Sequence, residues 1–261
     1  MNTIWITGAS SGIGEACAYK YAGNGERLVL TSSSEERLLP VAEKCRSLGS
    51  PGVAVLPYDF GNPEGLRILV RQAWDSFGGI DVLFCNAGIS QRTTVEDTSA
   101  AMVRKIMEVN YFSPVALAQA ILPMMVAAGG GRIAVTTSIA GYFGFPLRCA
   151  YSSSKHALYG FFETLQAECY NDDIRVTMVC PGRVQTNISV NALDKGGCRH
   201  GVMDPGQAGG ISADKAARKI VKAIRKGRRE VFVGGSELWM VRVKRFFPGL
   251  CAWLARRVNA V

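Results

Sequence analysis

The glycine-rich segment near the N-terminus constrains the fold more than any other part of the sequence. Apolar residues over 2–7 predict a strand, and the run that ends at Ala22 predicts a helix. The glycines between them are spaced G-x-x-x-G-x-G, and glycine permits a tight turn and a close approach of the backbone to a ligand. The helix N-terminus adds free N–H groups and the positive end of a dipole. The segment therefore predicts an anion site suited to a pyrophosphate, with Gly8, Ser10, Ser11, Gly12, Ile13 and Gly14 as its residues.

The rest of the chain alternates strand patterns with helical patterns. Strands are expected over 27–31, 53–58, 80–85, 132–136, 174–180 and 230–233, and helices over 63–77, 98–128 and 213–226 and around Tyr151. Apolar strands that alternate with helices predict a parallel sheet covered on both faces. We therefore expect an α/β fold with a seven-stranded parallel sheet, a single doubly wound Rossmann-type domain over 1–235, followed by a distinct tail over 236–261.

The expected strand ends carry the residues that a ligand site needs. Ligands of doubly wound sheets bind beyond the carboxyl ends of the strands. Polar or glycine-containing segments follow five of these ends, namely 8–14, Asp59, Asn86-Ala87-Gly88, Ser138 and Pro181-Gly182. The sequence therefore predicts that they meet at one edge of the sheet.

Tyr151 and Lys155 lie four residues apart at the start of an apolar-periodic run, so in a helix they share one face. A phenol has its pKa near 10, and bringing it near 7 requires about 4 kcal/mol of preferential stabilisation of the phenolate. A close ammonium group is one source of that stabilisation. An exposed pair on a surface helix would show the same spacing, so the pair gains meaning only from the motifs around it.

The end of the second expected strand bears on the choice of cofactor. Chains selective for NAD commonly place an acidic residue there, about 20 positions beyond the glycines. This sequence has Ser32, Ser33 and Ser34 instead, with Arg37 a turn further on, and hydroxyls with a cation suit a 2′-phosphate. These residues favour NADP over NAD, although Ser34 can equally cap the following helix.

Several short motifs occur together in a single order along the chain. They are Thr7-Gly8-x-x-x-Gly12-Ile13-Gly14, Asn86-Ala87-Gly88, Asn110, Ser138, Tyr151-x-x-x-Lys155 and Pro181-Gly182-x-x-x-Thr186. With these motifs the chain resembles the short-chain dehydrogenase/reductase family over essentially its whole length. Cys85 departs from the Asn-Asn-Ala-Gly that is common in the family, and the absence of a basic residue at Ser11 or Ser33 weakens the assignment to NADP.

The resemblance implies a role for each motif residue. Tyr151 would be the general acid or base, and Lys155 would lower its pKa and bind the nicotinamide ribose. Ser138 would hold the substrate oxygen, and Asn110 would support a water-linked proton relay. The implied cofactor contacts include Asp59 and Phe60 near the adenine, Asn86, Ala87 and Gly88 on the adenosine side, and Pro181, Gly182, Val184 and Thr186 near the carboxamide.

The expected function is that of an oxidoreductase that transfers hydride between NADP and a secondary alcohol or ketone, with an apolar small-molecule substrate. Two alternatives remain open. A reductase of 3-oxoacyl thioesters on carrier protein or coenzyme A would fit the net charge of +9. A non-catalytic NADP-binding sensor would use the same pocket without hydride transfer.

Composition narrows the remaining classes. The eight cysteines form no C-x-x-C pair, and only two histidines are present, so neither a metal site nor a disulfide framework is expected. This cysteine usage suits the cytoplasm. The positive charge is not accompanied by a basic-aromatic motif for nucleic acid, so no nucleic-acid partner is expected.

Substrate choice is expected to depend on the short segment 89–92 and on two longer segments. The first, 139–150, suggests an apolar wall of Tyr142, Phe143, Phe145, Pro146 and Leu147, although these residues could equally belong to the core or an interface. The second, 187–211, is rich in glycine, as in a mobile lid or a disordered loop.

The tail over 236–261 predicts two short amphipathic helices around Pro248-Gly249, rich in aromatic and basic residues. It also resembles the tail of the dehydrogenase/reductase member 7 group. Trp239, Phe246, Phe247 and Trp253 would form too large an apolar patch if all four faced water. We therefore expect the tail to be covered, by a second copy in a homo-oligomer (dimer or tetramer) or by the chain's own core, and peripheral contact with an anionic membrane is the alternative.

Overall fold

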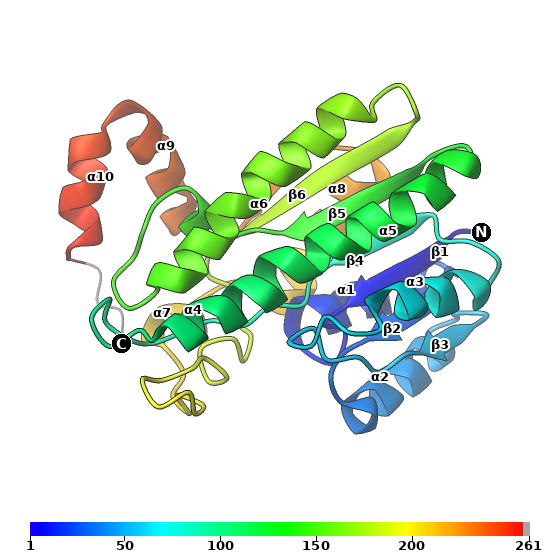
Figure 1. Ribbon diagram of the computed structural model, residues 1–261, viewed down its shortest axis with the longest axis horizontal. Helices are drawn as coiled ribbons and strands as arrows, with labels where there is room; N and C mark the ends of the chain where they lie inside the picture. Colours follow the sequence, from blue (N-terminus) through cyan, green and yellow to red (C-terminus); the bar gives the residue numbers. More distant parts are fainter. Residues whose placement is uncertain (258–261) are drawn as a thin grey trace.

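Seven parallel strands form one sheet, and helices cover both of its faces (Figure 1). The computed structural model describes residues 1–257. The strands are β1 (Thr3–Thr7), β2 (Arg27–Thr31), β3 (Val53–Val55), β4 (Val82–Cys85), β5 (Gly131–Thr136), β6 (Ile174–Pro181) and β7 (Glu230–Val233), in the order β3-β2-β1-β4-β5-β6-β7. The order reverses direction at β1, so the doubly wound fold expected from the alternating pattern is confirmed.

The helices lie between these strands in the sequence, in the alternation that the pattern predicts. They are α1 (Gly12–Ala22), α2 (Glu35–Ser47), α3 (Leu66–Asp75), α4 (Ala100–Met107), α5 (Ser113–Ala127), α6 (Cys149–Glu168), α7 (Pro205–Ala208), α8 (Ala213–Arg225), α9 (Trp239–Phe246) and α10 (Pro248–Ala255). Three short turns complete the set: the π-helical η1 (Glu108–Phe112) and the 3-10 turns η2 (Ile139–Gly141) and η3 (Ser236–Leu238).

The two faces of the sheet are packed against different helices. Along β1, Ile4 and Ile6 belong to a cluster with residues of α1, α2 and α8, whereas Trp5 belongs to a cluster with residues of α3, α5 and α6. Successive side chains of a strand point to opposite faces, so a strand buried on both faces must be apolar throughout. This explains why the strands appear in the sequence as continuous apolar runs.

The long helix expected over 98–128 is interrupted at its middle by η1. Pro114 has no N–H to donate to the carbonyl four residues earlier, that of Asn110, so the α-helical hydrogen-bond ladder cannot continue through this point. The combined run Ala100–Ala127 is apolar and long enough to span a membrane by composition. Its residues Leu117, Ile121 and Met125 are nevertheless buried in the core, as expected of a helix that packs on a sheet.

The tail forms two helices, α9 and α10, as predicted, and they pack against the segment that follows β5 (Figure 1). Phe143 and Cys180 are buried there together with Cys251 of α10. The predicted tail extends to 261, and its last part, including Val258, lies outside the described residues.

Candidate active site

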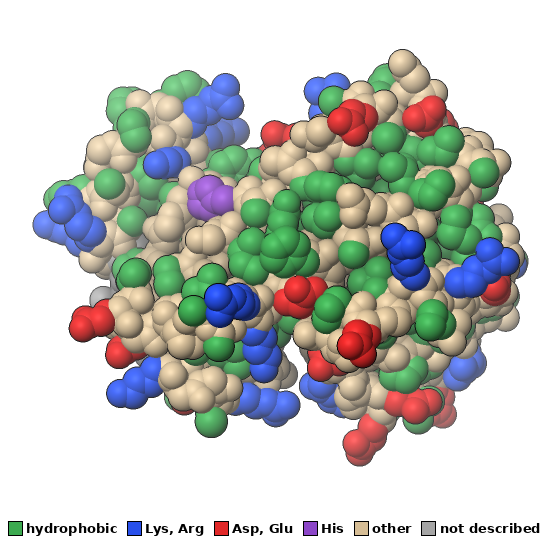
Figure 2. Space-filling model, in the orientation of Figure 1, with side chains coloured by type: hydrophobic (Ala, Val, Ile, Leu, Met, Phe, Trp, Pro, Cys, Tyr) green, Lys and Arg blue, Asp and Glu red, His purple; other side chains and the backbone are tan. Residues whose placement is uncertain are grey.

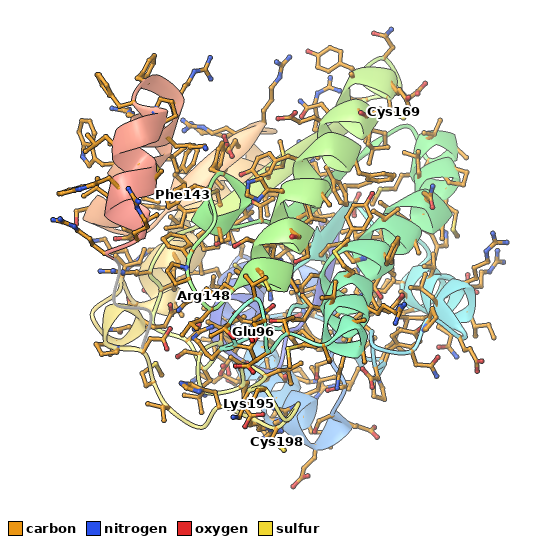
Figure 3. All side chains as sticks on the ribbon, turned by 60° about the vertical axis from the view of Figure 1, so that its left-hand side comes forward. Glu96, Phe143, Arg148, Cys169, Lys195 and Cys198 are labelled. Atoms are coloured by element: carbon orange, nitrogen blue, oxygen red, sulfur yellow. The ribbon has the colours of Figure 1, made fainter. Side chains whose placement is uncertain are left out.

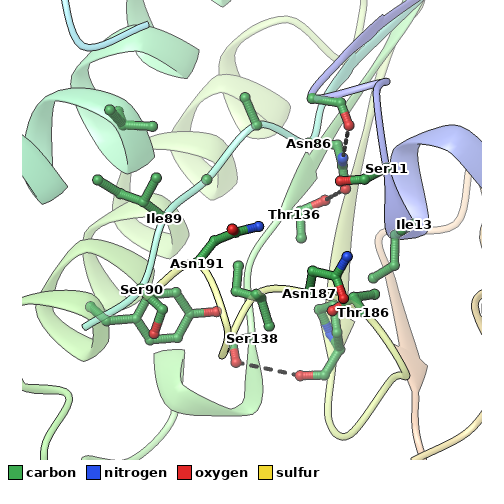
Figure 4. A pocket seen from close by; sticks show the side chains of 18 of the residues that line it. Ser11, Ile13, Asn86, Ile89, Ser90, Thr136, Ser138, Thr186, Asn187 and Asn191 are labelled. Carbon is green, nitrogen blue, oxygen red and sulfur yellow. Dashed lines mark hydrogen bonds between the residues drawn. The ribbon is translucent and has the colours of Figure 1, made fainter. Parts of the chain in front are cut away.

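One pocket of about 590 Å³ opens at the carboxyl ends of the strands. Most of the residues proposed from the sequence line it (Figure 4). They are Gly8, Ser10, Ser11, Gly12, Ile13, Ser32, Ser33, Arg37, Asp59, Phe60, Asn86, Ala87, Gly88, Ser138, Tyr151, Pro181, Gly182, Val184 and Thr186. Four others, Gly14, Ser34, Asn110 and Lys155, do not line the pocket, and their contacts explain why.

The glycines of the first turn are required by space as well as by conformation. Gly8 has φ +64°, and a Cβ atom there would lie 2.8 Å from the Cα atom of Ala87. Gly12 has φ +60°, and a Cβ atom there would lie 2.9 Å from Cγ2 of Thr186. Gly14 instead packs against the carbonyl of Gly8, so its smallness serves the close packing of helix on strand and not contact with the pocket.

Asn86 joins the ends of three neighbouring strands. Its Nδ2 donates to the carbonyls of Thr7 (3.2 Å) and Gly8 (3.3 Å), and its Oδ1 accepts from Oγ1 of Thr136 (3.0 Å). The backbone N–H groups of Asn86 and Ala87 both donate to Oγ1 of Thr7. The glycine turn is therefore held against β4 and β5 by side chains as well as by the sheet.

The residues after β2 divide between two roles. Ser32, Ser33 and Arg37 line the pocket, as expected for residues near a ribose. Ser34 is the N-cap of α2, and its Oγ accepts from the backbone N–H of Arg37 at 3.3 Å. Ser34 therefore caps the helix, and its contact with a cofactor stays a prediction.

Tyr151 and Ser138 face the same pocket from different elements. Tyr151 is in the first turn of α6, and Ser138 precedes η2, where its Oγ accepts from the N–H of Ala140 (3.1 Å) and donates to the carbonyl of Pro181 (3.4 Å). Burial raises the pKa of the Tyr151 phenol, and interactions with the Ser138 side chain, Arg148 and Arg92 partly offset this rise.

Lys155 lies one turn further along α6, behind the phenol. Its Nζ donates to the carbonyl of Thr136 at 2.7 Å and lies 5.7 Å from the centroid of the Tyr151 ring. Burial lowers the pKa of Lys155 to about 7. Burial opposes the charged forms of both groups, and the lowering of the phenol pKa by this lysine stays a prediction.

Asn110 lies in η1, and its amide is fully engaged with the protein. Oδ1 accepts from the N–H of Ile89 (2.9 Å), and Nδ2 donates to the carbonyl of Ile89 (2.9 Å) and to Oγ of Ser154 (3.0 Å). The side chain therefore joins the segment after β4 to α6, on the helix that carries Tyr151.

The substrate end differs from the expected aromatic wall. Phe145 lines the pocket, but Phe143 is turned away and buried beside the tail helices (Figure 3). Tyr142 donates to Oε1 of Glu230 (2.6 Å), away from the pocket. Tail residues of α9 and α10 supply the apolar surface that takes Phe143, which is why its position was not predictable from the local sequence.

The pocket-lining residues Arg92, Arg148 and Asp204 lie in segments that the sequence predicted for the substrate end, but their contacts with one another were not predicted. Asp204 accepts from both Nε (3.2 Å) and Nη2 (2.5 Å) of Arg92 and from Nη2 of Arg148 (2.7 Å). Gln91 is buried beside them and bonds to the start of α6. These partners are separated by 50 or more residues in the sequence, so no local pattern marks them.

The segment 187–211, expected to be a lid, closes one side of the pocket. Its residues Asn187, Ile188, Asn191 and Leu193 are part of the lining. Leu193 pairs with Gln91 in an isolated parallel bridge, and α7 follows near the end of the segment. The glycine-rich segment thus forms part of the pocket wall.

The sequence is similar to those of known proteins. The family model described as short chain dehydrogenase matches residues 2–196. "Dehydrogenase/reductase SDR family member 7B" of Bos taurus is 38% identical over 233 residues, which cover 87% of this chain and 72% of the relative. "Dehydrogenase/reductase SDR family protein 7-like" of Drosophila melanogaster is 36% identical over 255 residues, which cover 96% of this chain and 78% of the relative.

Two solved structures are similar along nearly the whole chain. A short chain dehydrogenase/reductase from Burkholderia phymatum in complex with NAD has a TM-score of 0.84 and 25% identity, with 95% of this chain and 94% of that chain covered. An alcohol dehydrogenase from Thermococcus sibiricus complexed with 5-hydroxy-NADP has a TM-score of 0.76 and 28% identity, with 90% and 97% covered. The fold, the pocket at the strand ends and these matches together place the chain in the short-chain dehydrogenase/reductase family.

Proposed function

We propose that this protein is an NAD(P)-dependent oxidoreductase that interconverts a secondary alcohol and a ketone. The observation that carries the proposal is the meeting of Ser138 and Tyr151 in the pocket that the glycine turn opens into, with Lys155 directly behind the phenol. The family's oxidoreductase chemistry supports the same reading.

The chain fits a dinucleotide at the glycine turn. A side chain at Gly8 or Gly12 would occupy space between the turn and Ala87 or Thr186, and the N-terminus of α1 directs N–H groups to this point. The bound nicotinamide supplies the hydride chemistry, and the protein supplies binding and orientation. The adenosine half of the cofactor would be held by Asp59, Phe60 and Asn86. The carboxamide group of the nicotinamide would be contacted by Pro181, Gly182, Val184 and Thr186.

The catalytic roles follow from what each group can donate or accept. Negative charge develops on the substrate oxygen when a carbonyl is reduced, and the hydroxyls of Ser138 and Tyr151 would donate hydrogen bonds to it. Tyr151 would exchange the proton with that oxygen. Lys155 would bind the ribose and stabilise the charged phenolate. Asn110 would fix the positions of Ile89 and Ser154 and so help to maintain a water-linked proton relay.

NADP is the preferred form of the cofactor in this proposal. Ser32, Ser33 and Arg37 line the pocket at the end of β2, and positions 32–34 carry no carboxylate to repel a 2′-phosphate. Arg37 stands in the first turn of α2 and can approach the phosphate with its guanidinium. Binding of NAD by the Burkholderia phymatum protein and of 5-hydroxy-NADP by the Thermococcus sibiricus protein is consistent with a nicotinamide dinucleotide in either form.

The substrate end of the pocket suits a mainly apolar small molecule. Ile89, Ile139, Phe145, Ile188 and Leu193 contribute apolar lining around the position of Tyr151. An apolar ketone or alcohol would displace water from these side chains and leave its oxygen to Ser138 and Tyr151.

We also propose that residues 1–235 form the catalytic domain and that the tail over 236–261 associates with a second copy of the chain in the cytoplasm. Trp239, Phe246, Phe247, Leu250 and Trp253 are 43–68% exposed on the outer face of the tail. Their exposed area is on the order of 600 Å², close to the roughly 800 Å² that each partner contributes to a standard interface. Figure 2 shows Lys and Arg side chains beside apolar ones over α9 and α10, so an anionic membrane is the competing outcome.

Replacement of the phenol tests the proposed reaction. Tyr151→Phe should lose nearly all turnover of an apolar ketone with NADPH, while the dissociation constant for NADPH changes little. Tyr170→Phe, at an exposed tyrosine beyond the far end of α6, is the matched control and should behave as the parent protein. Substantial turnover by Tyr151→Phe would refute the mechanism.

A further inference from the structure

The helix that carries Tyr151 begins without a cap from its own N-cap residue. That residue, Arg148, has φ −139° and ψ 35°, and its side chain is directed to Asp204 and makes no capping bond. The first N–H groups of a helix have no partner within the helix, so when buried they need an acceptor from elsewhere. The first hydrogen bond of the helix itself runs only from Ser152 to the carbonyl of Arg148.

A glutamine from a distant segment supplies the missing cap. Oε1 of Gln91 accepts from the backbone N–H groups of Ala150 (3.0 Å) and Tyr151 (3.2 Å). These are the second and third residues of α6, the positions that an N-cap side chain ordinarily satisfies. The cap therefore acts directly on the backbone of Tyr151.

The rest of the Gln91 amide is held in the orientation that this role requires. The two hydrogens of Nε2 are shared among three acceptors, Oγ1 of Thr93 (2.9 Å), Oγ1 of Thr98 (3.0 Å) and Sγ of Cys149 (3.3 Å). Gln91 is fully buried. A flipped amide would set its NH₂ group against two N–H donors, so the backbone of α6 determines which end is oxygen.

The backbone around Gln91 is also fixed on both sides. The N–H of Leu193 donates to the carbonyl of Ser90 (2.9 Å), and the N–H of Arg92 donates to the carbonyl of Leu193 (2.8 Å). The N–H of Thr93 donates to the carbonyl of Leu147, just before α6. Gln91 thus connects the pocket wall formed by 187–211 to the first turn of α6.

We propose that Gln91 is a positioning residue that sets the place of the Tyr151 phenol by capping α6 through space. Loss of the cap would let the first turn fray, and the phenol would move relative to Ser138 and to a bound substrate. Displacement of a reacting group by about 1 Å can cost on the order of 100-fold in rate. The effect on turnover rests on the proposed function, whereas the effect on the helix does not.

The first test compares three variants. Gln91→Met removes all of the amide's hydrogen bonds at similar length, Gln91→Glu keeps an acceptor for the two N–H groups, and Gln166→Met is the control at a buried glutamine further along the same helix. We expect Gln91→Met to lower kcat at least tenfold, with KM and the dissociation constant for NADPH within about twofold of the parent. Equal loss of kcat in Gln166→Met, or unchanged kcat in Gln91→Met, would overturn the proposal.

Amide hydrogen exchange gives a readout that does not depend on activity. Residues 149–152 should exchange at least tenfold faster in Gln91→Met than in the parent, and Gln91→Glu should restore slow exchange because the acceptor oxygen is retained. Unchanged exchange at these residues would refute capping by Gln91. Absence of turnover in the parent protein would instead count against the proposed function and leave the exchange result to decide this inference.

A milder variant keeps the test available if Gln91→Met does not fold. Thr98→Val removes one partner of the Gln91 amide nitrogen, so the amide is held less firmly and its oxygen should move from the N–H groups of α6. Faster exchange at 149–152 together with lower kcat would support the proposal, and parent values for both would refute it.

Discussion

Nζ of Lys155 donates a hydrogen bond of 2.7 Å to the carbonyl of Thr136, the last residue of β5. Oγ1 of the same threonine donates to Asn86, which in turn holds the glycine turn. One residue at a strand end therefore connects the helix of the catalytic tyrosine proposed here with the turn proposed for the cofactor. The buried lysine and the glycine turn are therefore parts of one hydrogen-bonded unit.

Burial of Lys155 makes the stability of the cofactor-free protein depend on pH. Its pKa falls from 10.5 to about 7 in the folded state, so between these values the unfolded chain binds more protons than the native one. The lowered pKa of Lys155 therefore does not reduce the free energy of unfolding above about pH 10.5, and it reduces that free energy progressively as pH falls toward 7. Relative to Lys155→Met, the free energy of unfolding of the parent should rise by about 4 kcal/mol from pH 6 to pH 10.

Urea denaturation at several pH values measures this difference. Lys222→Met, at an exposed position of α8, is the control and should show a nearly constant difference, because an exposed ammonium loses little hydration on folding. A flat difference for Lys155→Met would show that the ammonium is stabilised in the folded protein by contacts that outweigh burial.

The glycine turn should tolerate no side chain at its first position. Gly8→Ala adds a methyl group 2.8 Å from the Cα atom of Ala87 and also forces alanine to φ +64°. We expect a loss of more than about 2 kcal/mol of stability and at least tenfold weaker NADPH binding. Gly25→Ala is the control, because Gly25 has φ +73° and open space around it, so an alanine there is strained in its backbone conformation but meets no neighbouring atom.

Thermal denaturation and a fluorescence titration with NADPH separate the two glycine variants. Similar losses of stability in both, with cofactor affinity unchanged in Gly8→Ala, would mean that the space beside Ala87 does not matter for the cofactor.

Cofactor preference should respond to one charge at the end of β2. Ser32 is buried and lines the pocket, so Ser32→Asp would place a carboxylate near the proposed 2′-phosphate. NADPH binding should weaken at least tenfold by repulsion, with NADH binding preserved. Ser32→Asn is the uncharged control of the same size. Equal or tighter binding of NADH than of NADPH by the parent would refute the preference for NADP.

Removal of the tail should disturb the pocket as well as the surface. Oε1 of Glu237 accepts from the backbone N–H of Arg183 (2.6 Å), which follows β6 in the pocket wall, and α10 buries Phe143. Truncation after Gly235 should therefore lower Tm by at least about 5 °C and raise KM for an apolar ketone. A truncated protein with parental Tm and KM would show that the tail supports neither.

The outer face of the tail can be tested without loss of its inner contacts. Trp239→Ser combined with Phe246→Ser changes two side chains that are 64% and 68% exposed. We expect parental Tm with a lower mass in sedimentation, because a second copy would lose its contact. Unchanged mass, together with flotation of the parent on vesicles of anionic lipid, would assign the face to a membrane instead.

The parallel sheet and the location of the pocket were predictable because each rests on patterns within a few residues. Alternation of apolar runs and helical periods predicted the parallel sheet. The carboxyl ends of parallel strands lie at the same edge of the sheet whatever the order of the strands, so the location of the pocket followed. The glycine turn and the four-residue spacing of Tyr151 and Lys155 likewise depend only on local backbone geometry. The interruption at Asn110 had a local signal too, Pro114, although one long helix was expected there.

The pKa values, hydrogen-bond partners and side-chain positions at the site were decided by the tertiary structure. The depressed pKa of Lys155 comes from burial under β5, the cap on Tyr151 comes from Gln91, and Phe143 turns to a tail more than 90 residues away in the sequence. The physical reason is the distance along the sequence over which each kind of interaction acts. Backbone propensity and periodicity act over a turn or a strand and are written in neighbouring residues, whereas burial, electrostatic environment and hydrogen bonds between distant segments exist only once the sheet and helices have packed.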